Sequence, residues 1–118
     1  MADRHPTRQL SEDEWIVLLD VYQTHRGEPL SAKHPAIVKA SETLNALGER
    51  DGRRSGPNFR SPSGLQRQIT TFKYLDPEYQ SADHKVPPLA EKVWTRFSND
   101  PRNCRITADA VRAKAEGR

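Results

Sequence analysis

The sequence contains a single cysteine and no long apolar run, and both absences limit what the protein can be. One cysteine, Cys104, excludes an intramolecular disulfide, and a chain without disulfides fits a reducing compartment. No apolar segment approaches the roughly 20 residues of a membrane span, and the first residues lack the apolar core of a signal peptide. The 118 residues are therefore expected to form one cytoplasmic domain with a modest hydrophobic core.

Potential metal ligands are few, and the sequence shows no catalytic motif. A structural zinc site needs about four ligands at close spacings. The histidines and the cysteine stand singly along the chain, at His5, His25, His34, His84 and Cys104. No Walker-type glycine loop, G-x-S-x-G elbow, paired-carboxylate signature or metal-binding nuclease motif is present. The sequence therefore predicts a binding domain with no metal, no cofactor and no catalytic residue.

The net charge of +3 is unevenly distributed along the chain. Residues 1–30 carry three basic and six acidic side chains, whereas residues 48–73 carry six basic and two acidic ones. The positive charge is thus concentrated in the middle of the sequence. A basic segment of this size is typical of a surface that binds a polyanion, and a merely solvated surface is the alternative.

Helix signals recur from residue 10 to residue 116. Ser11 and Glu14 form a capping box at the start of a first helix, which Gly27 ends. A second helix is expected from Pro35 to Gly48, a third from Pro62, a fourth over 89–97 and a fifth from residue 101, with Cys104 on its buried side. No strand-like alternation is sustained. The predicted fold is all-α: a compact bundle of about five helices over residues 10–116, after a flexible tail over 1–9.

The third helix carries the features that bear on function. Ser61 caps it, and Leu65, Ile69 and Phe72 fall on one side, which is expected to face the core. The opposite side has no acidic residue and suits a polyanion. It collects Ser63, Arg67, Thr70 and Tyr74, flanked by Gln66, Thr71 and Lys73.

A glycine- and arginine-rich loop precedes this helix. Residues 48–57 have no periodicity, and their arginines Arg50, Arg53 and Arg54 could form a mobile clamp on phosphates. The alternative is a solvated loop without such a role. A capped helix with one basic-polar face behind an arginine-rich loop is typical of helix-turn-helix-like readers of the DNA major groove.

A family resemblance accompanies these features. Trp15 with Leu-Leu-Asp-Val-Tyr over 18–22, the His34-Pro35 helix start, and Leu-Asn-x-Leu over 44–47 are part of an ordered series. The series continues with Gly-Pro-Asn-Phe-Arg-Ser-Pro-Ser-Gly over 56–64, Phe72, Leu-Asp-Pro over 75–77, Val-Trp-x-x-Phe over 93–97 and Asp100-Pro101. Over about residues 12–112 the chain resembles the N-terminal domain that precedes the HNH nuclease module in bacterial McrA-like, modification-dependent restriction endonucleases.

The resemblance implies a DNA-recognition domain that directs a nuclease to 5-methylcytosine-containing double-stranded DNA in bacterial defence. A homodimer on DNA is one arrangement that the sequence leaves open. This chain has no HNH motif, so the nuclease would lie outside it. A groove reader needs a donor for guanine and an apolar group for the methyl. The predicted base or methyl contacts are Phe59, Arg60, Ser63, Gln66, Arg67, Thr70 and Tyr74, and the predicted phosphate contacts are Arg50, Arg53, Arg54, Ser61, Thr71 and Lys73.

Other interpretations stay open at this point. The chain could be a helix-turn-helix-like binder of unmodified or phosphorothioate DNA, or a protein-interaction module whose basic face meets an acidic partner. Arg60 and Arg67 could form surface ion pairs, and Phe59 could simply pack. Extrusion of the modified base into a pocket needs stacking side chains, and too few aromatic residues are free of the core to favour it.

Overall fold

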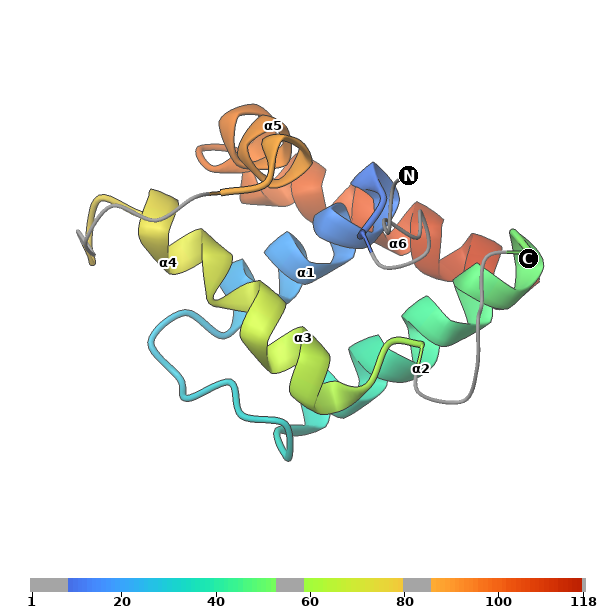
Figure 1. The fold of residues 1–118 in the computed structure, drawn as a ribbon. Helices are drawn as coiled ribbons and strands as arrows, with labels where there is room; N and C mark the ends of the chain where they lie inside the picture. Colours follow the sequence, from blue (N-terminus) through green and yellow to red (C-terminus); the bar gives the residue numbers. More distant parts are fainter. Residues whose placement is uncertain (1–8, 53–58, 80–85, 118) are drawn as a thin grey trace, which may run out of the picture.

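Six helical segments make up the fold in the computed structural model, which describes residues 9–52, 59–79 and 86–117 (Figure 1). No strand occurs in these ranges, which confirms the all-α prediction. None of their helices combines the length and apolar character needed to cross a bilayer. The helices are α1 (Glu12–Thr24), α2 (Pro35–Arg50), α3 (Pro62–Ile69), α4 (Thr71–Leu75), α5 (Pro88–Phe97) and α6 (Pro101–Ala115).

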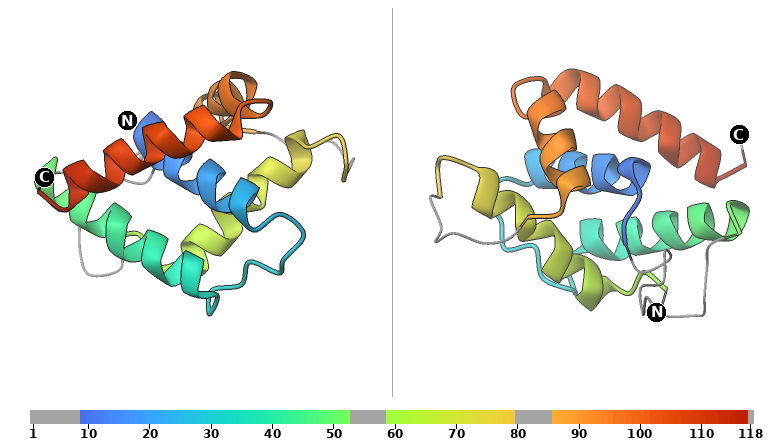
Figure 2. Two further views of the ribbon diagram at one scale, coloured as in Figure 1. Left: turned by 180° about the vertical axis from the view of Figure 1, so that it is seen from behind. Right: turned by 45° about the horizontal axis from the view of Figure 1, so that its top comes forward.

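Helix α1 lies at the centre of the bundle. Every residue from Glu14 to Tyr22 is buried, because α1 contacts α2, α3, α5 and α6 on different sides. Helices α3 and α4 run across the front of the molecule in Figure 1, and α6 lies behind α1, as the rear view in Figure 2 shows. The outer side of α3 is therefore open to solvent.

The predicted helix starts are confirmed. Ser11 and Glu14 form a reciprocal capping box on α1, with the Ser11 N–H donating to Glu14 Oε1 at 2.8 Å. Ser61 Oγ accepts the Gly64 N–H at 3.2 Å, and a proline follows the N-cap in α2, α3 and α6. These signals are local, so the sequence alone identifies them.

Two predicted helix boundaries are wrong. Helix α2 continues through Gly48 to Arg50, and the ring of Phe59 packs where a β-carbon at Gly48 would lie. The predicted third helix is divided between Ile69 and Thr71, since Thr70 Oγ1 donates to the Gln66 carbonyl oxygen at 3.0 Å. A threonine bonded back to the preceding turn bends a helix, and its β-branched neighbours weaken the helix further.

The connection before α3 is longer than the turn of a helix-turn-helix motif. Such a motif joins its helices by three or four residues, whereas residues 51–61 separate α2 from α3. Part of this connection, residues 53–58, lies outside the described ranges. Residues 1–8 of the predicted tail lie outside them as well.

An aromatic cluster holds α4 against the bundle. The ring of Phe72 is fully buried, and its centroid lies 5.6 Å from that of Trp15, 5.8 Å from Tyr22 and 6.0 Å from Trp94. Leu65 and Ile69 are buried on the same side of α3. The predicted core-facing side of the third helix is thus confirmed across both of its segments.

Buried carboxylates are each paired with arginine. Glu14 and Arg60, exposed by only 1% and 5%, are joined by a contact of 2.6 Å between Arg60 Nε and Glu14 Oε2. Asp20 accepts from Arg105 at 2.8 Å and from Arg112 at 2.7 Å. Losing one partner of a buried ion pair would leave an unpaired charge away from water, which is strongly destabilising. These contacts therefore hold distant parts of the chain together.

The only cysteine lies in the interface between α6 and α1. Cys104 is fully buried, and its Sγ lies 3.8 Å from the carbonyl oxygen of Ile16. Burial, followed by the charge of Asp20, raises the pKa of its thiol to about 12. Cys104 therefore behaves as a small apolar core residue, as its place in the helical pattern predicts.

Replacing Arg60 tests the weight of the ion pair with Glu14. Arg60→Ala leaves a carboxylate buried without its cation, so we expect the free energy of unfolding to fall by about 3–5 kcal/mol. Urea denaturation followed by circular dichroism measures it. Arg67→Ala is the control, because this exposed arginine should change stability by no more than about 0.5 kcal/mol. Equal stability of Arg60→Ala and the parent chain would contradict this account.

Candidate nucleic-acid interface

The solvent side of α3 and α4 forms a continuous polar surface, here called the α3 face. It consists of exposed Ser63, Gln66, Arg67 and Lys73 and half-buried Thr70. These positions share one side because they follow the helical repeat, while Leu65 and Ile69 face the core. No acidic residue occurs from Pro62 to Leu75, so the two cations of this face act without a nearby carboxylate on the same helices.

The two cations of the α3 face are available to a ligand. Arg67 is exposed and forms no ion pair or hydrogen bond within the described ranges. Lys73 is also exposed, and its Nζ lies 5.5 Å from the ring centroid of Tyr79. A guanidinium presents a planar fork of donors, whereas an ammonium is a point charge. Arg67 is therefore suited to a base edge, and Lys73 to a phosphate.

Two polar residues of the α3 face, Gln66 and Thr70, already make hydrogen bonds. Gln66 Oε1 accepts the Ala32 N–H at 2.9 Å, which links α3 to the loop before α2. Its amide NH₂ remains as a donor. The Thr70 hydroxyl donates to the Gln66 carbonyl oxygen, so the methyl group of Thr70 is the part of this side chain that can make an apolar contact.

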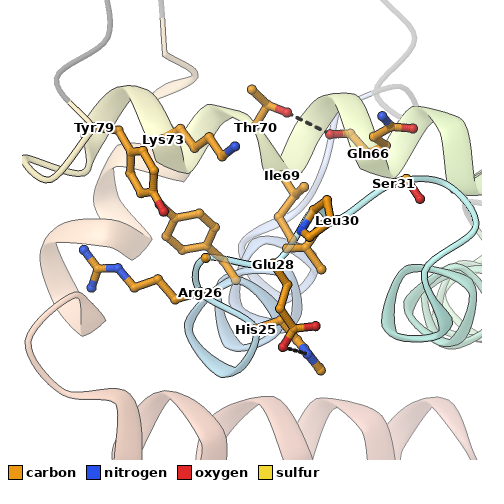
Figure 3. Close-up of a pocket in the computed structure, with 13 residues that line it drawn as sticks. His25, Arg26, Glu28, Leu30, Ser31, Gln66, Ile69, Thr70, Lys73 and Tyr79 are labelled. Atoms are coloured by element: carbon orange, nitrogen blue, oxygen red, sulfur yellow. Dashed lines mark hydrogen bonds and ion pairs between the residues drawn. The ribbon is translucent and has the colours of Figure 1, made fainter.

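A groove of about 450 Å³ adjoins the α3 face (Figure 3). Gln66, Thr70 and Lys73 lie along one wall, and the loop after α1 forms the facing wall with His25, Arg26 and Glu28. The groove combines cationic and anionic groups with the aromatic ring of Tyr79. Its remaining lining residues are Tyr22, Gly27, Pro29, Leu30, Ser31 and Ile69.

A buried carboxylate fixes one end of this groove. Asp76 is 1% exposed and accepts the Tyr22 hydroxyl at 2.8 Å, the Arg26 guanidinium at 2.6 Å and the Glu78 N–H at 2.9 Å. Burial, followed by the hydrogen bond to Asp76, raises the pKa of the Tyr22 phenol. Asp76 thus holds the end of α1 against the end of α4. The sequence predicted only a helix end at this position.

The predicted base contact by Arg60 is wrong. Both carboxylate oxygens of Glu14 accept from its guanidinium, at 2.6 and 3.1 Å, and the carbonyl oxygen of Gln9 accepts at 3.2 Å. The backbone of Arg60 is held as well, because its N–H donates to Asn45 Oδ1 at 3.1 Å. The alternative interpretation, that Arg60 forms an ion pair, holds, but the pair with Glu14 is buried and not at the surface.

The structure places three further predicted contacts in supporting roles. Phe59 is half-buried and packs against Gly48, with the Arg60 guanidinium 3.8 Å from its ring centroid, so the packing interpretation holds. Thr71 is buried, with 9% exposure, and is not accessible to a phosphate. Ser61 is half-buried and caps α3.

The other predicted contacts differ in where they lie. Tyr74 is half-buried beside the α3 face. Arg50 is exposed at the end of α2 and does not line the groove. Arg53 and Arg54 lie outside the described residues. The structure therefore brings together Ser63, Gln66, Arg67, Thr70 and Lys73 out of the predicted set.

Two histidines that stand apart in the sequence meet in the loop between α1 and α2. His25 Nδ1 lies 3.1 Å from Glu28 Oε2, and His34 Nε2 lies 2.9 Å from Glu28 Oε1. These hydrogen bonds, that of His34 first, lower the pKa of Glu28. The three side chains are of metal-ligating type, so the fold brings together two histidines that the sequence places apart. The sequence signal for this cluster is the spacing His-x₂-Glu-x₅-His, which is visible only when Glu28 is counted together with the histidines.

Comparisons with protein-family models, with curated proteins and with solved structures found no match to this chain. The resemblance to the N-terminal domain of McrA-like endonucleases therefore rests on the sequence motifs alone.

The packing of Phe59 on Gly48 can be measured by a double-mutant cycle. Gly48→Ala places a methyl group 2.4 Å from a ring carbon of Phe59, so we expect a loss of about 1–3 kcal/mol in unfolding free energy. In a Phe59→Ala background the same change should instead stabilise by up to about 1 kcal/mol, because alanine favours a helix. Urea denaturation of the four proteins measures both effects, and equal effects of Gly48→Ala in both backgrounds would contradict the contact.

The raised pKa of Tyr22 predicts a loss of stability at high pH. The folded protein keeps the phenol protonated where the unfolded chain, with an ordinary pKa near 10.0, releases the proton. The stabilisation is complete below pH 10 and falls by about 1.4 kcal/mol for each pH unit above it. Tyr22→Phe lacks this term, so its stability relative to the parent should rise by that amount between pH 9 and pH 11 in urea denaturation. A constant difference would refute the prediction.

Proposed function

We propose that this chain is a domain that binds double-stranded DNA through the α3 face. The observation that carries the proposal is an exposed helical surface with Arg67 and Lys73, polar side chains between them and no acidic residue from Pro62 to Leu75. Phosphates supply most of the affinity of such surfaces, and side chains on an inserted helix read the base edges. Buried Leu65, Ile69 and Phe72 hold the face rigidly against the core.

The finer proposal is that the domain recognises 5-methylcytosine and directs a nuclease outside this chain to it. With Arg60 buried, Arg67 is the remaining arginine of the predicted guanine contacts, and the methyl group of Thr70 is available for the methyl group of the base. Thr70 and Arg67 are three positions apart on one side of the helix, so they would contact neighbouring bases. The resemblance to McrA-like endonucleases supports the choice of modification.

Energetics limit how strongly a methyl group alone can be recognised. Burying one methyl contributes on the order of 1 kcal/mol, which corresponds to a several-fold preference. A bidentate arginine–guanine contact contributes about 1–3 kcal/mol. Discrimination beyond several-fold would therefore require the Arg67 contact to form only when the methyl group is in place.

Fluorescence anisotropy with matched duplexes tests the proposal. Duplexes that are unmodified, hemimethylated or fully methylated at cytosine are titrated with the chain at two salt concentrations. We expect tighter binding to methylated DNA at both salt concentrations, because a base contact depends on salt less than phosphate contacts do. Equal affinities that fall together with salt would contradict methyl recognition and leave phosphate binding alone.

Three single substitutions locate the interface. Arg67→Ala should weaken binding to the preferred duplex by about 10–100-fold and remove the preference, since it deletes a base contact. Lys73→Ala should weaken binding to all duplexes alike and lower the salt slope by about 1. Arg102→Ala removes the same charge from an exposed position on α6, behind α1, and is the control. An equal loss in all three variants would show a nonspecific charge effect and refute the proposed face.

The alternative functions give different outcomes in the same assay. A reader of unmodified DNA shows a sequence preference that methylation does not improve, and a phosphorothioate reader binds a sulfur-substituted duplex most tightly. A protein-interaction module shows weak affinity without sequence preference. Each of these outcomes would contradict recognition of 5-methylcytosine and favour the corresponding alternative function.

A further inference from the structure

The loop between α1 and α2 brings three ligand-type side chains to one point. His25 is the C-cap of α1, His34 is the N-cap of α2, and Glu28 lies between them. One ligand atom from each lies within 4.8 Å of the others. The two imidazole nitrogens approach opposite oxygens of one carboxylate, so the three groups converge rather than merely adjoin.

We propose that His25, Glu28 and His34 form a binding site for a divalent transition-metal ion, with Zn²⁺ as its best match. Two imidazoles and one carboxylate are the donor set that three-ligand zinc sites use, and they leave a fourth position for water or a substrate group. Mg²⁺ and Ca²⁺ prefer oxygen ligands and are disfavoured here.

The ligand atoms must come closer together to hold the ion. Zinc binds imidazole nitrogen at about 2.0–2.1 Å and carboxylate oxygen at about 2.0–2.2 Å, so its tetrahedral ligand atoms lie roughly 3.3 Å apart. The two nitrogen–oxygen distances here are 3.1 and 2.9 Å, to different oxygens of Glu28. One ligand atom from each side chain lies within 4.8 Å of the others, so the ion requires them to approach by about 1.5 Å at most. The Glu28 side chain is 50% exposed, and those of His25 and His34 are 28% and 17% exposed. The ion can thus enter from solvent while the rings are held by packing.

The loop backbone supports this convergence. The Glu28 N–H donates to the His25 carbonyl oxygen at 2.9 Å, and the His34 N–H donates to that of Ser31 at 3.0 Å. The imidazole rings meet edge to face with centroids 4.9 Å apart. Two of the three ligands are therefore anchored at helix ends before any ion binds, which reduces the ordering that binding requires.

The hydrogen bond from the Ala36 N–H to His34 competes with metal binding, and its loss would be a measurable sign of the bound ion. His34 Nδ1 accepts the Ala36 N–H at 3.0 Å, so the neutral ring carries its proton on Nε2 and donates it to Glu28. A metal on Nε2 moves this proton to Nδ1, and the Ala36 N–H then loses its acceptor. Losing a helix cap lowers the affinity by on the order of tenfold without abolishing binding. The Ala36 amide should report the ion directly.

The test uses the full chain in a buffer that does not chelate metals. Zn²⁺ is titrated by calorimetry, and Co²⁺ by its visible absorption, which distinguishes tetrahedral coordination. We expect one ion per chain and a large shift of the Ala36 amide signal in the ¹⁵N-correlated NMR spectrum. Glu28→Gln and His25→Ala should each weaken binding by at least about tenfold.

Two further variants keep the result interpretable. His34→Asn removes the imidazole but keeps a good N-cap side chain, so α2 should stay folded while ion affinity falls at least about tenfold. The double variant His5→Ala with His84→Ala removes the two other histidines of the chain and should leave the affinity unchanged. Circular dichroism confirms that each variant is folded. Failure of the folded parent chain to bind, or equal affinities of all variants, would overturn the site.

This site does not depend on the proposed DNA function. The DNA assays alter Arg67 and Lys73 on α3 and α4, whereas the metal assays alter the loop between α1 and α2. His25 and Glu28 also line the groove beside the α3 face, so a bound ion would set the position of the groove wall that faces Gln66 and Lys73. Either proposal can fail while the other stands.

Discussion

Glu14 carries the constraint on which the rest of the fold depends. Its Oε1 atom accepts both the Ser11 N–H, which completes the cap of α1, and the Arg60 guanidinium, which Oε2 accepts as well. One carboxylate therefore fixes both the start of the central helix α1 and the position of Arg60, just before α3. The backbone of Arg60 is in turn held by Asn45 on α2. Because charge and hydrogen bonds must be satisfied together in a dry interior, three helices are positioned relative to one another at this point.

Local signals explain what could be predicted from the sequence. The capping box at Ser11, the proline after the N-caps of α2, α3 and α6, and the apolar repeat Leu65, Ile69, Phe72 depend on neighbours within one or two turns. All of them are present in the structure. The break at Thr70 is also local, but a hydroxyl bonded to the preceding turn competes with a continuous helix and the pattern alone does not decide between them.

Long-range pairings account for what could not be predicted. Arg60 reads as a surface cation in a basic segment, and only the fold reveals that a carboxylate from 46 positions earlier neutralises it. Asp76 reads as a helix end, yet it receives the hydroxyl of Tyr22 and the guanidinium of Arg26. Charge patterns in a sequence count side chains, whereas a binding surface consists of those that remain unpaired after folding. Burial of Arg60 leaves Arg67 and Lys73 as the cations of the α3 face.

The buried thiol of Cys104 can report how often α6 separates from α1. A thiol reagent reacts with the thiolate form of cysteine. While α6 lies on α1, the raised pKa of Cys104 and its contact with the Ile16 carbonyl oxygen suppress this reaction. Labelling therefore proceeds only through molecules in which this helix has moved away. The labelling rate relative to that of a free thiol then measures how often the interface opens, with no engineered probe. DNA or metal ions that stabilise the closed form would slow the labelling of Cys104. The labelling rate would therefore report binding at a site distant from the interface between α1 and α6.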